Sequence, residues 1–520
     1  MCGIVGYVGY KPAVDILLDG LEQLEYRGYD SSGIAVKCSD GIKVYKAEGK
    51  LKNLREELAP HAYEISKATV GIGHIRWATH GAPTVVNAHP HTCGCGKLVV
   101  VHNGIIENYK ELKAELEAKG CVFKSQTDTE IVAHLVASIY GEVKELTKAV
   151  QIAAKKLEGA YALCIMHNDE PNKIVATKRN APLVVAVGEK EFYVASDVPA
   201  FIKHTKKAIY LADNQVVTLT PESIKLEDEN ELEIVPKVEL LPWEPVALSK
   251  MGYKHFMLKE IHEQPDVIRN ILVGKLHTPD SQIVLNEVKL TKETLKNLNR
   301  IQVVACGTSL HAAMIGKYVI ENFCSIPVDV EASSEYIYRK TVTDEHTLVI
   351  GVSQSGETAD TLTAIKQSKA RGSHILIITN RPDSAMAREA DSLLSVNAGI
   401  EVSVAATKSY IAQLTSFYLL ALYMAEIKGT VPAGELTSLK SEMLLLPQKI
   451  EQILAHKENI QACARRYANT RDFIYIARGI NYPTALEGAL KLKEISYINA
   501  TGYPAGELKH GPIAMLDETM

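Results

Sequence analysis

Hydrophobic residues in the first 240 positions fall into short runs separated by polar turns. The pattern predicts strands at 3–8, 34–37, 70–75, 98–102, 161–166, 174–176, 183–187 and 192–195. Two stretches, 13–24 and 129–139, instead repeat apolar residues at helical spacing. Many strands, few helices and no regular alternation between them predict an α+β domain with packed sheets over residues 1–240.

The pattern changes after about residue 240. The stretch 229–258 is charged and then contains Pro236, Pro242 and Pro245, a composition typical of a linker. Beyond it, apolar strands at 302–305, 347–352, 374–379 and 393–396 alternate with helices that begin at 309, 358 and 407. This alternation predicts an α/β domain in which helices cover both faces of a parallel sheet.

An internal repeat relates IQVVACGTSLHAAMIGKYVI, beginning at residue 301, to DFIYIARGINYPTALEGALKL, beginning at residue 472. Each copy contains a strand, a Gly-bearing turn and a helix. We expect a linker with lead-in helices at 241–290, a first repeat domain at 291–430 and the start of a second at 459–520. Because a single strand cannot bury both of its faces, we also expect the second domain to be incomplete and the chain to be C-terminally truncated.

Composition narrows the choice of partners. Hydrophobic residues make up 46% and charged residues 23%, and 57 basic against 62 acidic side chains give a net charge of −5. Without a basic run interleaved with aromatics, we expect small molecules rather than nucleic acid or a membrane as partners. Nine cysteines without framework spacing predict reduced thiols in the cytoplasm, and no apolar stretch reaches the roughly 18 residues of a membrane span.

Cys2 directly follows the initiator Met. Removal of that Met would leave a thiol and a free α-amine on one residue. Because an α-amine titrates near roughly 7.7–8.0, it could accept the thiol proton at neutral pH and so generate a nucleophile. Taken alone, an ordinary cysteine at position 2 is the commoner interpretation.

Six motifs occur in order along the first domain: CGIVGY at 2–7, LEYRGYDSSG at 24–33, GHIRWATHG at 73–81, NAHPH at 87–91, VVHNGIIENY at 100–109 and SQTDTE at 125–130. Together they resemble a class II glutamine amidotransferase domain of the N-terminal-nucleophile type, with an αββα fold. The resemblance implies that Cys2 attacks the glutamine amide and that Asn103 and the Gly104 N–H form the oxyanion hole. It assigns glutamine binding to Arg76, Trp77, Thr79, His80 and Asp128, with Trp77 as the gate for internal transfer of ammonia.

The residue types suit this chemistry independently of the family. A thioester route needs a thiolate and donors aimed at the developing oxyanion, while Arg76 suits a carboxylate and Asp128 an ammonium. Taken singly, Arg76 could form a surface ion pair, Asp128 could cap the helix at 129–139, and Trp77 could be a buried anchor.

A zinc site is a weaker alternative near the amidotransferase motifs. Four potential ligands alternate along one extended stretch: His89, His91, Cys93 and Cys95. A structural zinc site usually takes two separated pairs of ligands, so a variable loop is the favoured interpretation and we expect no metal.

Two Gly-bearing turns follow strands in the second half of the chain. The stretch TLVIGVSQSGETADT leads from an apolar strand through residues 353–358 into a helix, and CGTS at 306–309 does the same. Free N–H groups at a helix start, together with hydroxyls, are typical of phosphate binding, although a Ser-rich helix cap is the alternative. The turn at 353–358 has no Walker lysine, so it is no nucleotide P-loop.

These turns and the repeat resemble sugar isomerase (SIS) domains, which hold phosphosugars. Joined to the N-terminal module, and with HFMLKEIHEQP at 255–265 and ALEGALKLKEISYINATGYPAGELKHGP at 485–512, they resemble the family of glutamine-fructose-6-phosphate aminotransferases (isomerizing). The resemblance implies a cytoplasmic homodimer without cofactor. It implies conversion of fructose 6-phosphate and L-glutamine to glucosamine 6-phosphate and L-glutamate, the first step of hexosamine synthesis.

By the same resemblance, the sugar phosphate is bound by Thr308, Ser309, Ser353, Gln354, Ser355 and Thr358. Glu494 moves a proton between C1 and C2 with Lys491 beside it, and His510 serves ring opening in the partner subunit's site. Taken alone, Lys491 and Glu494 would be a solvated helix pair and His510 a turn residue.

The chain departs from the family pattern at Ala406, where a serine often contacts the sugar, and it stops before the family's C-terminal tail with its sugar-site lysine. Two rival functions stay open. One is another amidotransferase, forming phosphoribosylamine or asparagine, although the corresponding pyrophosphate loops are not seen. The other is a regulator that binds sugar phosphate without turnover.

Overall fold

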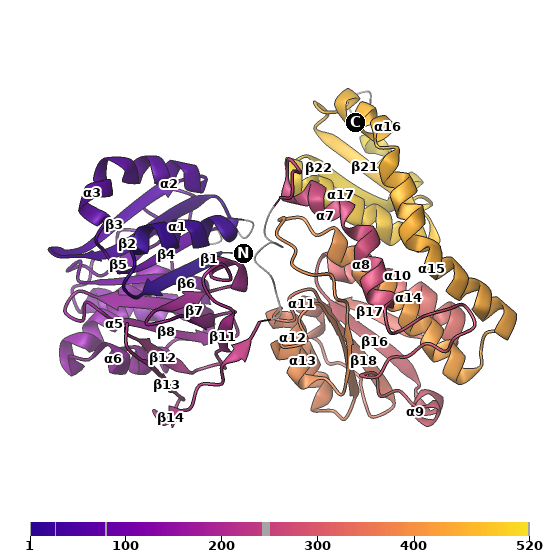
Figure 1. The fold of residues 1–520 in the computed structure, drawn as a ribbon, viewed down its shortest axis with the longest axis horizontal. Helices are drawn as coiled ribbons and strands as arrows, with labels where there is room; N and C mark the ends of the chain where they lie inside the picture. Colours follow the sequence, from indigo (N-terminus) through magenta and orange to yellow (C-terminus); the bar gives the residue numbers. More distant parts are fainter. Residues whose placement is uncertain (1, 26–27, 78–80, 242–249, 518–520) are drawn as a thin grey trace. The chain divides into compact units, whose positions relative to one another are not determined.

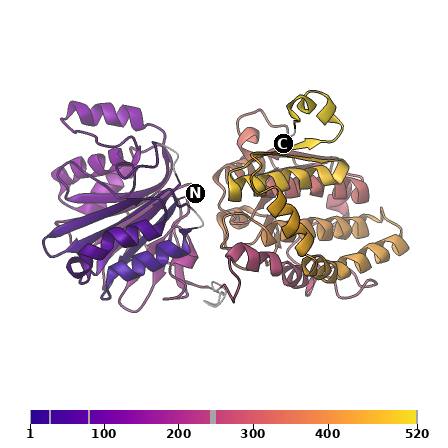
Figure 2. The ribbon, with the colours of Figure 1, turned by 90° about the horizontal axis from the view of Figure 1, so that it is seen from above.

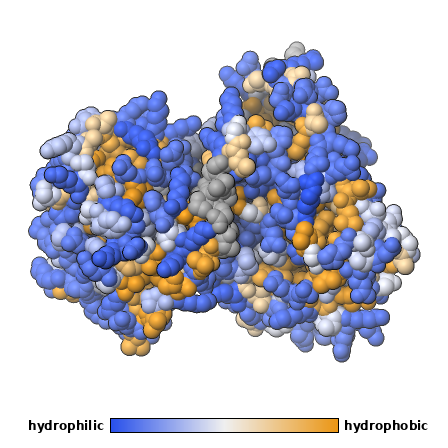
Figure 3. Space-filling model, in the orientation of Figure 1, coloured by the Kyte–Doolittle hydropathy of each residue, from blue (hydrophilic) through white to orange (hydrophobic). Residues whose placement is uncertain are grey.

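The computed structural model describes residues 2–25, 28–77, 81–241 and 250–517, and it divides into two compact units, 1–249 and 250–520. Figure 1 shows the first unit in indigo to magenta and the second in pink to yellow. On the face seen in Figure 3, hydrophilic residues predominate over each unit. All nine cysteines are free thiols.

Two stacked, mainly antiparallel sheets form the centre of the first unit. The eight-stranded sheet has the order β15 (Glu239–Leu240), β11 (Lys207–Tyr210), β9 (Val184–Val187), β10 (Phe192–Ala195), β1 (Gly3–Val8), β4 (Val70–Arg76), β2 (Ser31–Cys38) and β3 (Gly41–Glu48). The seven-stranded sheet has the order β14 (Glu233–Ile234), β13 (Ile224–Glu227), β12 (Val216–Leu219), β8 (Ile174–Arg179), β7 (Gly159–His167), β6 (Leu98–Ile106) and β5 (His91–Thr92). The side chains of Ile4, Ile72, Val101 and Cys164 share the core between the two sheets.

Helices cover the outer faces of these sheets. Figure 2 shows indigo helices on one side of the stack and purple helices on the other. The first group is α1 (Ala13–Gln23), α2 (Leu51–Leu58) and α3 (Ala62–Ile65), and the second is α4 (Tyr109–Ala118), α5 (Thr129–Val143) and α6 (Leu146–Ala154). The αββα arrangement confirms the predicted fold class. Helices other than α1 and α5 escaped prediction because they are short or, like α4, bury only two leucines among charged residues.

A parallel five-stranded sheet organises the second unit. Its order is β17 (Val328–Ala332), β16 (Arg300–Ala305), β18 (Thr347–Ser353), β19 (His374–Thr379) and β20 (Ser392–Ser395). One face packs against α8 (Gln264–Leu272), α10 (Thr308–Cys324) and α14 (Lys408–Lys428), and the other against α11 (Ser333–Tyr336), α12 (Ala359–Lys369) and α13 (Ala385–Glu389). The predicted α/β domain is therefore confirmed, with β17 as an additional edge strand.

Helix α14 is the one described helix long and apolar enough to cross a membrane, and 67% of its most apolar window is buried inside the protein. Such burial is typical of the core helix of a soluble protein. Helix α9 (Lys292–Asn297) packs against α14, and α7 (Phe256–His262) directly precedes α8.

The second repeat copy is larger than its sequence pattern indicates. After α15 (Ala433–Ala455) and α16 (Glu458–Arg466), strand β21 (Asp472–Ala477) pairs in parallel with a further strand, β22 (Asn499–Pro504). Helix α17 (Tyr482–Ser496) packs on both strands and also on α10 of the first copy. The sequence predicted one strand here, because NATGYP carries too few apolar residues to be recognised as a strand.

Substituting Phe417 by Ala should destabilise the second unit. Phe417 on α14 is fully buried, and its ring fills the space beside Gly316 on α10. Loss of a buried phenylalanine costs about 3–5 kcal/mol of unfolding free energy. Urea unfolding should show this loss for Phe417→Ala, whereas Tyr338→Ala, at an 87% exposed position, should stay near the parent. Equal stability of the two variants would contradict this packing.

Candidate functional site

Cys2 lies immediately before β1, the strand at the centre of the eight-stranded sheet. Because β1 pairs with β4 in the register Gly3 with Ile75, the thiol lies beside the residues that follow β4. The Trp77 N–H donates to Cys2 Sγ at 3.3 Å, and the thiol lies 3.5 Å from the Trp77 carbonyl oxygen. The nucleophile candidate is therefore held by the backbone at Trp77.

Asn103, near the end of β6, reaches the same place from the other sheet. Its Nδ2 donates to the Cys2 carbonyl oxygen at 3.2 Å. The next residue, Gly104, has φ of +118°, and a Cβ there would lie 2.0 Å from the Ala160 carbonyl oxygen. Only glycine can occupy this position, so the backbone bend that follows Asn103 depends on it.

Arg76 and Asp128 are both buried. The Arg76 guanidinium donates to the carbonyl oxygens of Gly81 at 3.1 Å and Ala82 at 3.3 Å. Burial lowers the pKa of Arg76, and the charges of Cys2 and Asp128 oppose that shift. With an exposure of 3%, Arg76 is not a surface ion pair.

Asp128 stands at the N-cap position of α5 without capping it by its side chain. Its Oδ2 accepts instead from the Ile106 N–H at 2.8 Å, and its Oδ1 lies 4.0 Å from His102 Nδ1. The helix-cap alternative is therefore wrong for this carboxylate.

Trp77 is half-buried, and its ring meets the Tyr29 ring edge-on with centroids 5.7 Å apart. Thr79 and His80 lie outside the described residues.

The alternating His and Cys residues after β4 have partners inside the protein. His89 Nε2 lies 3.3 Å from Thr129 Oγ1, His91 Nε2 lies 3.1 Å from Thr127 Oγ1, and the thiols of Cys93 and Cys95 are 3.0 Å apart. Burial holds the pKa of each histidine well below its usual value. Over the ranges that the structure describes, no three His, Cys, Asp or Glu side chains are arranged to hold a metal ion.

In the second unit, the turn after β18 is stabilised by its own hydroxyls. Ser353 Oγ accepts from the Gly356 N–H at 3.0 Å and lies 2.9 Å from Thr358 Oγ1. Ser355 Oγ accepts from the Glu357 N–H at 3.2 Å. Gly356 has φ of +65°, and Ser384 Oγ lies where its Cβ would be. The hydroxyls of this turn and the start of α12 thus converge at the carboxyl edge of the sheet.

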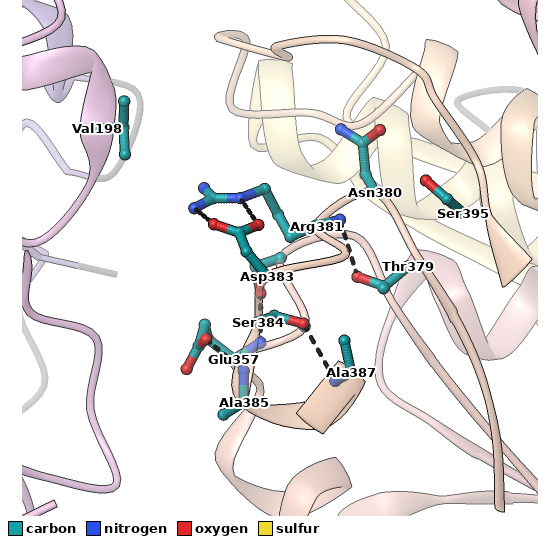
Figure 4. Close-up of polar contacts among 12 residues, drawn as sticks. Val198, Glu357, Thr379, Asn380, Arg381, Asp383, Ser384, Ala385, Ala387 and Ser395 are labelled. Atoms are coloured by element: carbon teal, nitrogen blue, oxygen red, sulfur yellow. Dashed lines mark hydrogen bonds and ion pairs between the residues drawn. The ribbon is translucent and has the colours of Figure 1, made fainter. Parts of the chain in front are cut away.

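The loop after β19 supports that turn (Figure 4). The Ala385 N–H donates to Glu357 Oε1 at 2.8 Å, and the Arg381 N–H donates to Thr379 Oγ1 at 3.2 Å. Arg381 also forms a two-point ion pair with Asp383, with both distances 3.1 Å. The loops at the carboxyl ends of β18 and β19 are therefore tied together by polar contacts.

Thr308 at the start of α10 contacts α17 of the second repeat copy. Its Oγ1 donates to Glu487 Oε1 at 2.9 Å and accepts from Lys491 Nζ at 3.0 Å. His311 Nδ1 lies 2.7 Å from Glu487 Oε2, and Lys491 also pairs with Glu494 at 2.6 Å. The structure thus brings together Thr308, Lys491 and Glu494.

Glu487 is a buried member of this site that the sequence analysis missed. Burial alone would raise the pKa of its carboxyl, but the hydrogen bond from His311 and the charge of Lys491 lower it overall. Its spacing of four from Lys491 was the available signal, since such residues share one helix face.

His510 is exposed on the loop after β22, and it therefore lies on a different element from Lys491 and Glu494 of α17. Ser309 Oγ accepts from Gln413 Nε2 at 3.0 Å.

The HFMLKEIHEQP motif holds the loop that contains Ala406. Glu260 on α7 accepts from the N–H groups of Val402 at 2.5 Å and Ser403 at 3.1 Å, and from the Ser403 hydroxyl. Glu263 pairs with Lys408 at 2.7 Å at the start of α14. The motif therefore fixes the segment of chain that leads into α14.

Comparisons with known proteins find a related domain in each half of the chain. A glutamine amidotransferase domain model matches residues 84–203, and a SIS domain model matches residues 294–423 and 467–520. A solved C-terminal domain of glucosamine-fructose-6-phosphate aminotransferase from Francisella tularensis is 40% identical, with a TM-score of 0.50, over 52% of this chain and 76% of that chain. The fold and site define an amidotransferase joined to sugar isomerase domains.

Full-length relatives identify the family. Glutamine–fructose-6-phosphate aminotransferase (isomerizing) from Gloeobacter violaceus is 49% identical over 519 residues, 99% of this chain and 84% of the relative. The protein of the same name from Methanosarcina acetivorans is 47% identical over 527 residues, 100% of this chain and 84% of the relative. The chain belongs to the glutamine–fructose-6-phosphate aminotransferase (isomerizing) family.

Replacing Glu487 by Gln should loosen α17 from α10. The change removes a buried charge from a network with His311 and Lys491, which costs about 1–3 kcal/mol. Amide hydrogen exchange in α17 should therefore speed up about tenfold near pH 6. Because the pKa of Glu487 lies below its ordinary value, the carboxylate stabilises at neutral pH, and the difference from the parent should shrink as the pH falls through that lowered pKa. Glu442→Gln, at an exposed ion pair with Lys449, is the matched control; equal exchange rates in α17 of both variants would contradict the network.

Proposed function

We propose that this chain transfers the amide nitrogen of L-glutamine to D-fructose 6-phosphate, giving D-glucosamine 6-phosphate and L-glutamate. The observation that carries the proposal is the contact of Cys2 with Trp77 and with Asn103: Cys2 precedes β1, Trp77 follows β4 of the same sheet, and Asn103 lies on β6 of the other sheet. Arg76 and Asp128 are buried, and the charges of Cys2 and Asp128 both act on the Arg76 guanidinium. The same chain also carries the hydroxyl-rich turn at 353–358.

In the glutaminase half, the Cys2 thiol would pass its proton to the α-amine, and the resulting thiolate would attack the amide carbon of glutamine. The α-ammonium then gives that proton to the leaving nitrogen as the carbon–nitrogen bond breaks, so that ammonia departs and a thioester remains. Water hydrolyses the thioester to glutamate and restores the thiol. Asn103 Nδ2 and the Gly104 N–H would stabilise the tetrahedral oxyanion in both steps.

Glutamine binding fits the two buried charges of Arg76 and Asp128. The Arg76 guanidinium offers a planar pair of donors to the α-carboxylate, and Asp128 offers its carboxylate to the α-ammonium. Family resemblance adds Trp77, Thr79 and His80 to this set. We further propose that released ammonia moves internally to the sugar site with Trp77 as the gate.

In the sugar half, the phosphate would bind at Ser353, Gln354, Ser355 and Thr358, with Thr308 and Ser309 at the neighbouring turn. Backbone N–H groups at a helix start suit an anion, and hydroxyls add donors. Glu494 would carry the proton between C1 and C2, with Lys491 bridging it to Thr308 at 3.0 Å. His510 would serve ring opening in the partner subunit's site.

The remaining expectations complete the proposal. We propose a homodimer in the cytoplasm that uses neither metal nor organic cofactor. The domain limits are proposed as 1–240, 241–290, 291–430 and 459–520. The comparisons give no support to a regulator without turnover, because the relatives described above carry the name of the aminotransferase.

Cys2→Ala should abolish glutamine hydrolysis, because the amine alone cannot form the thioester. We expect glutamate release to fall below about one thousandth of the parent rate, as for loss of other catalytic nucleophiles. Cys38→Ala, a change at a buried cysteine on β2, serves as the control and should keep the parent rate. The parent should also bind a reactive glutamine analogue covalently at Cys2, which peptide mass spectrometry detects. Turnover of Cys2→Ala within about tenfold of the parent would rule out this nucleophile.

Ser353→Ala and Thr358→Ala should each weaken binding of fructose 6-phosphate. Hydrogen bonds to a charged group contribute about 1–3 kcal/mol, which corresponds to about a 5- to 150-fold rise in Kd. Calorimetry measures this change, and glutamine binding should stay at the parent value. Thr430→Ala, at an exposed hydroxyl beyond α14, is the control. Unchanged sugar affinity in both variants would mean that the turn is only a helix cap.

A further inference from the structure

His74 lies directly behind the oxyanion residue and has no role in the function proposed above. It is a central residue of β4, paired with Ile4 of β1 on one side and Gly33 of β2 on the other. Its side chain is fully buried, and its Nε2 lies 3.0 Å from Asn103 Oδ1. A side chain fixed in one sheet thus contacts the catalytic amide that the other sheet supplies.

The hydrogen-bond directions at Asn103 follow from its two contacts. Its Nδ2 faces the Cys2 carbonyl oxygen, which can only accept, so the amide nitrogen must be on that side. The amide oxygen Oδ1 therefore faces His74 and can only accept, so His74 Nε2 must carry the hydrogen. If the amide turned over, its oxygen would face the Cys2 side and would repel a developing oxyanion.

The His74 ring is itself held in place and neutral. It stacks on His89 with ring centroids 4.1 Å apart, and Thr129 Oγ1 joins His89 to His102 with distances of 3.3 and 2.8 Å. Burial, together with the charges of His102 and Arg76, lowers the pKa of His74 to about 3, against opposing effects of the Asn103 hydrogen bond and of the His102 backbone. The ring is thus a neutral donor that cannot rotate freely.

We propose that His74 is a positioning residue of glutamine hydrolysis: its Nε2–H donates to Asn103 Oδ1 and keeps Asn103 Nδ2 directed at the Cys2 side. This inference rests on the proposed function, in which Asn103 stabilises the oxyanion. The neutral imidazole carries no proton to or from the substrate. It acts only through the orientation of Asn103.

Two substitutions separate the hydrogen bond from the packing. His74→Phe keeps a ring to stack on His89 but removes the donor, whereas His74→Gln can still present an N–H to Asn103. For His74→Phe we expect kcat for glutamine hydrolysis to fall about 10- to 100-fold, less than the roughly 10²–10³-fold that follows loss of an oxyanion donor itself. The KM for glutamine should change less than about threefold because Arg76 and Asp128 are intact. His74→Gln should recover to within about fivefold of the parent.

Further readouts distinguish positioning from a structural role. Alkylation of Cys2 by iodoacetamide needs the thiolate but no oxyanion donor, so its rate in His74→Phe should stay within about twofold of the parent. In an Asn103→Ala background, His74→Phe should cause no further fall in kcat for glutamine hydrolysis. The ratio of parent to variant kcat should be constant between about pH 6 and 9, because His74 is neutral throughout. His167→Phe, at another buried histidine of this unit whose ring centroid lies 3.8 Å from that of Tyr140, is the matched control and should leave kcat near the parent.

Four results would overturn the inference: His74→Phe with kcat within twofold of the parent, an equal loss in the Asn103→Ala background, no recovery by His74→Gln, or a kcat ratio that varies with pH. Circular dichroism checks folding, and His74→Met, which also lacks a donor, replaces His74→Phe if that variant does not fold. Full loss in Cys2→Ala with no effect of His74→Phe would overturn this inference alone. Turnover retained in Cys2→Ala would overturn the proposed nucleophile, and with it the premise.

Discussion

Pairing between β1 and β4 is the constraint on which the glutamine site depends. Their register, Gly3 with Ile75, places Cys2 beside Trp77, whose N–H meets the thiol. A shift of one residue would turn every side chain of β1 to the opposite face, so the register is specified by the core itself. Two glycines of β4 let α1 approach closely, since a Cβ at Gly73 would lie 3.0 Å from Leu21 Cδ1.

The second sheet, stacked on the first, contributes Asn103 to the glutamine site. Asn103 enters from β6 and contacts both Cys2 and His74, so its amide is held from two sides by residues of the first sheet. A buried polar group without a partner costs about 1–3 kcal/mol. The amide of Asn103 avoids that cost because Cys2 pairs with its nitrogen and His74 with its oxygen.

The sugar half depends on a different principle. Parallel strands end at one edge of their sheet, so the turns after β16 and β18 become neighbours although the paired residues Ala305 and Val352 at the strand ends are 47 positions apart (352 − 305) in the sequence. Helix α17 of the second copy then adds Glu487 and Lys491 to the start of α10. A buried carboxylate is tolerable there only because His311, Thr308 and Lys491 surround it.

Periodicity and six ordered motifs were enough, by themselves, to determine the two fold classes and the family, and they named Trp77 and Asn103, which contact Cys2 in the structure. They failed where burial depends on a distant partner: β17 alternates valine with acidic residues at a sheet edge, and Glu487 resembles a surface residue until α10 covers it. They also left two roles open for Asp128, a helix cap or a glutamine-binding residue, because the spacing of residues along the chain does not specify the hydrogen-bond partner of a side chain. Tertiary structure alone decided that its carboxylate bonds the Ile106 N–H, and that Asn103 turns its oxygen to His74. Local patterns indicate which face of a single element will be buried, whereas hydrogen-bond partners, and burial beneath a distant element, are decided only when separate elements come together.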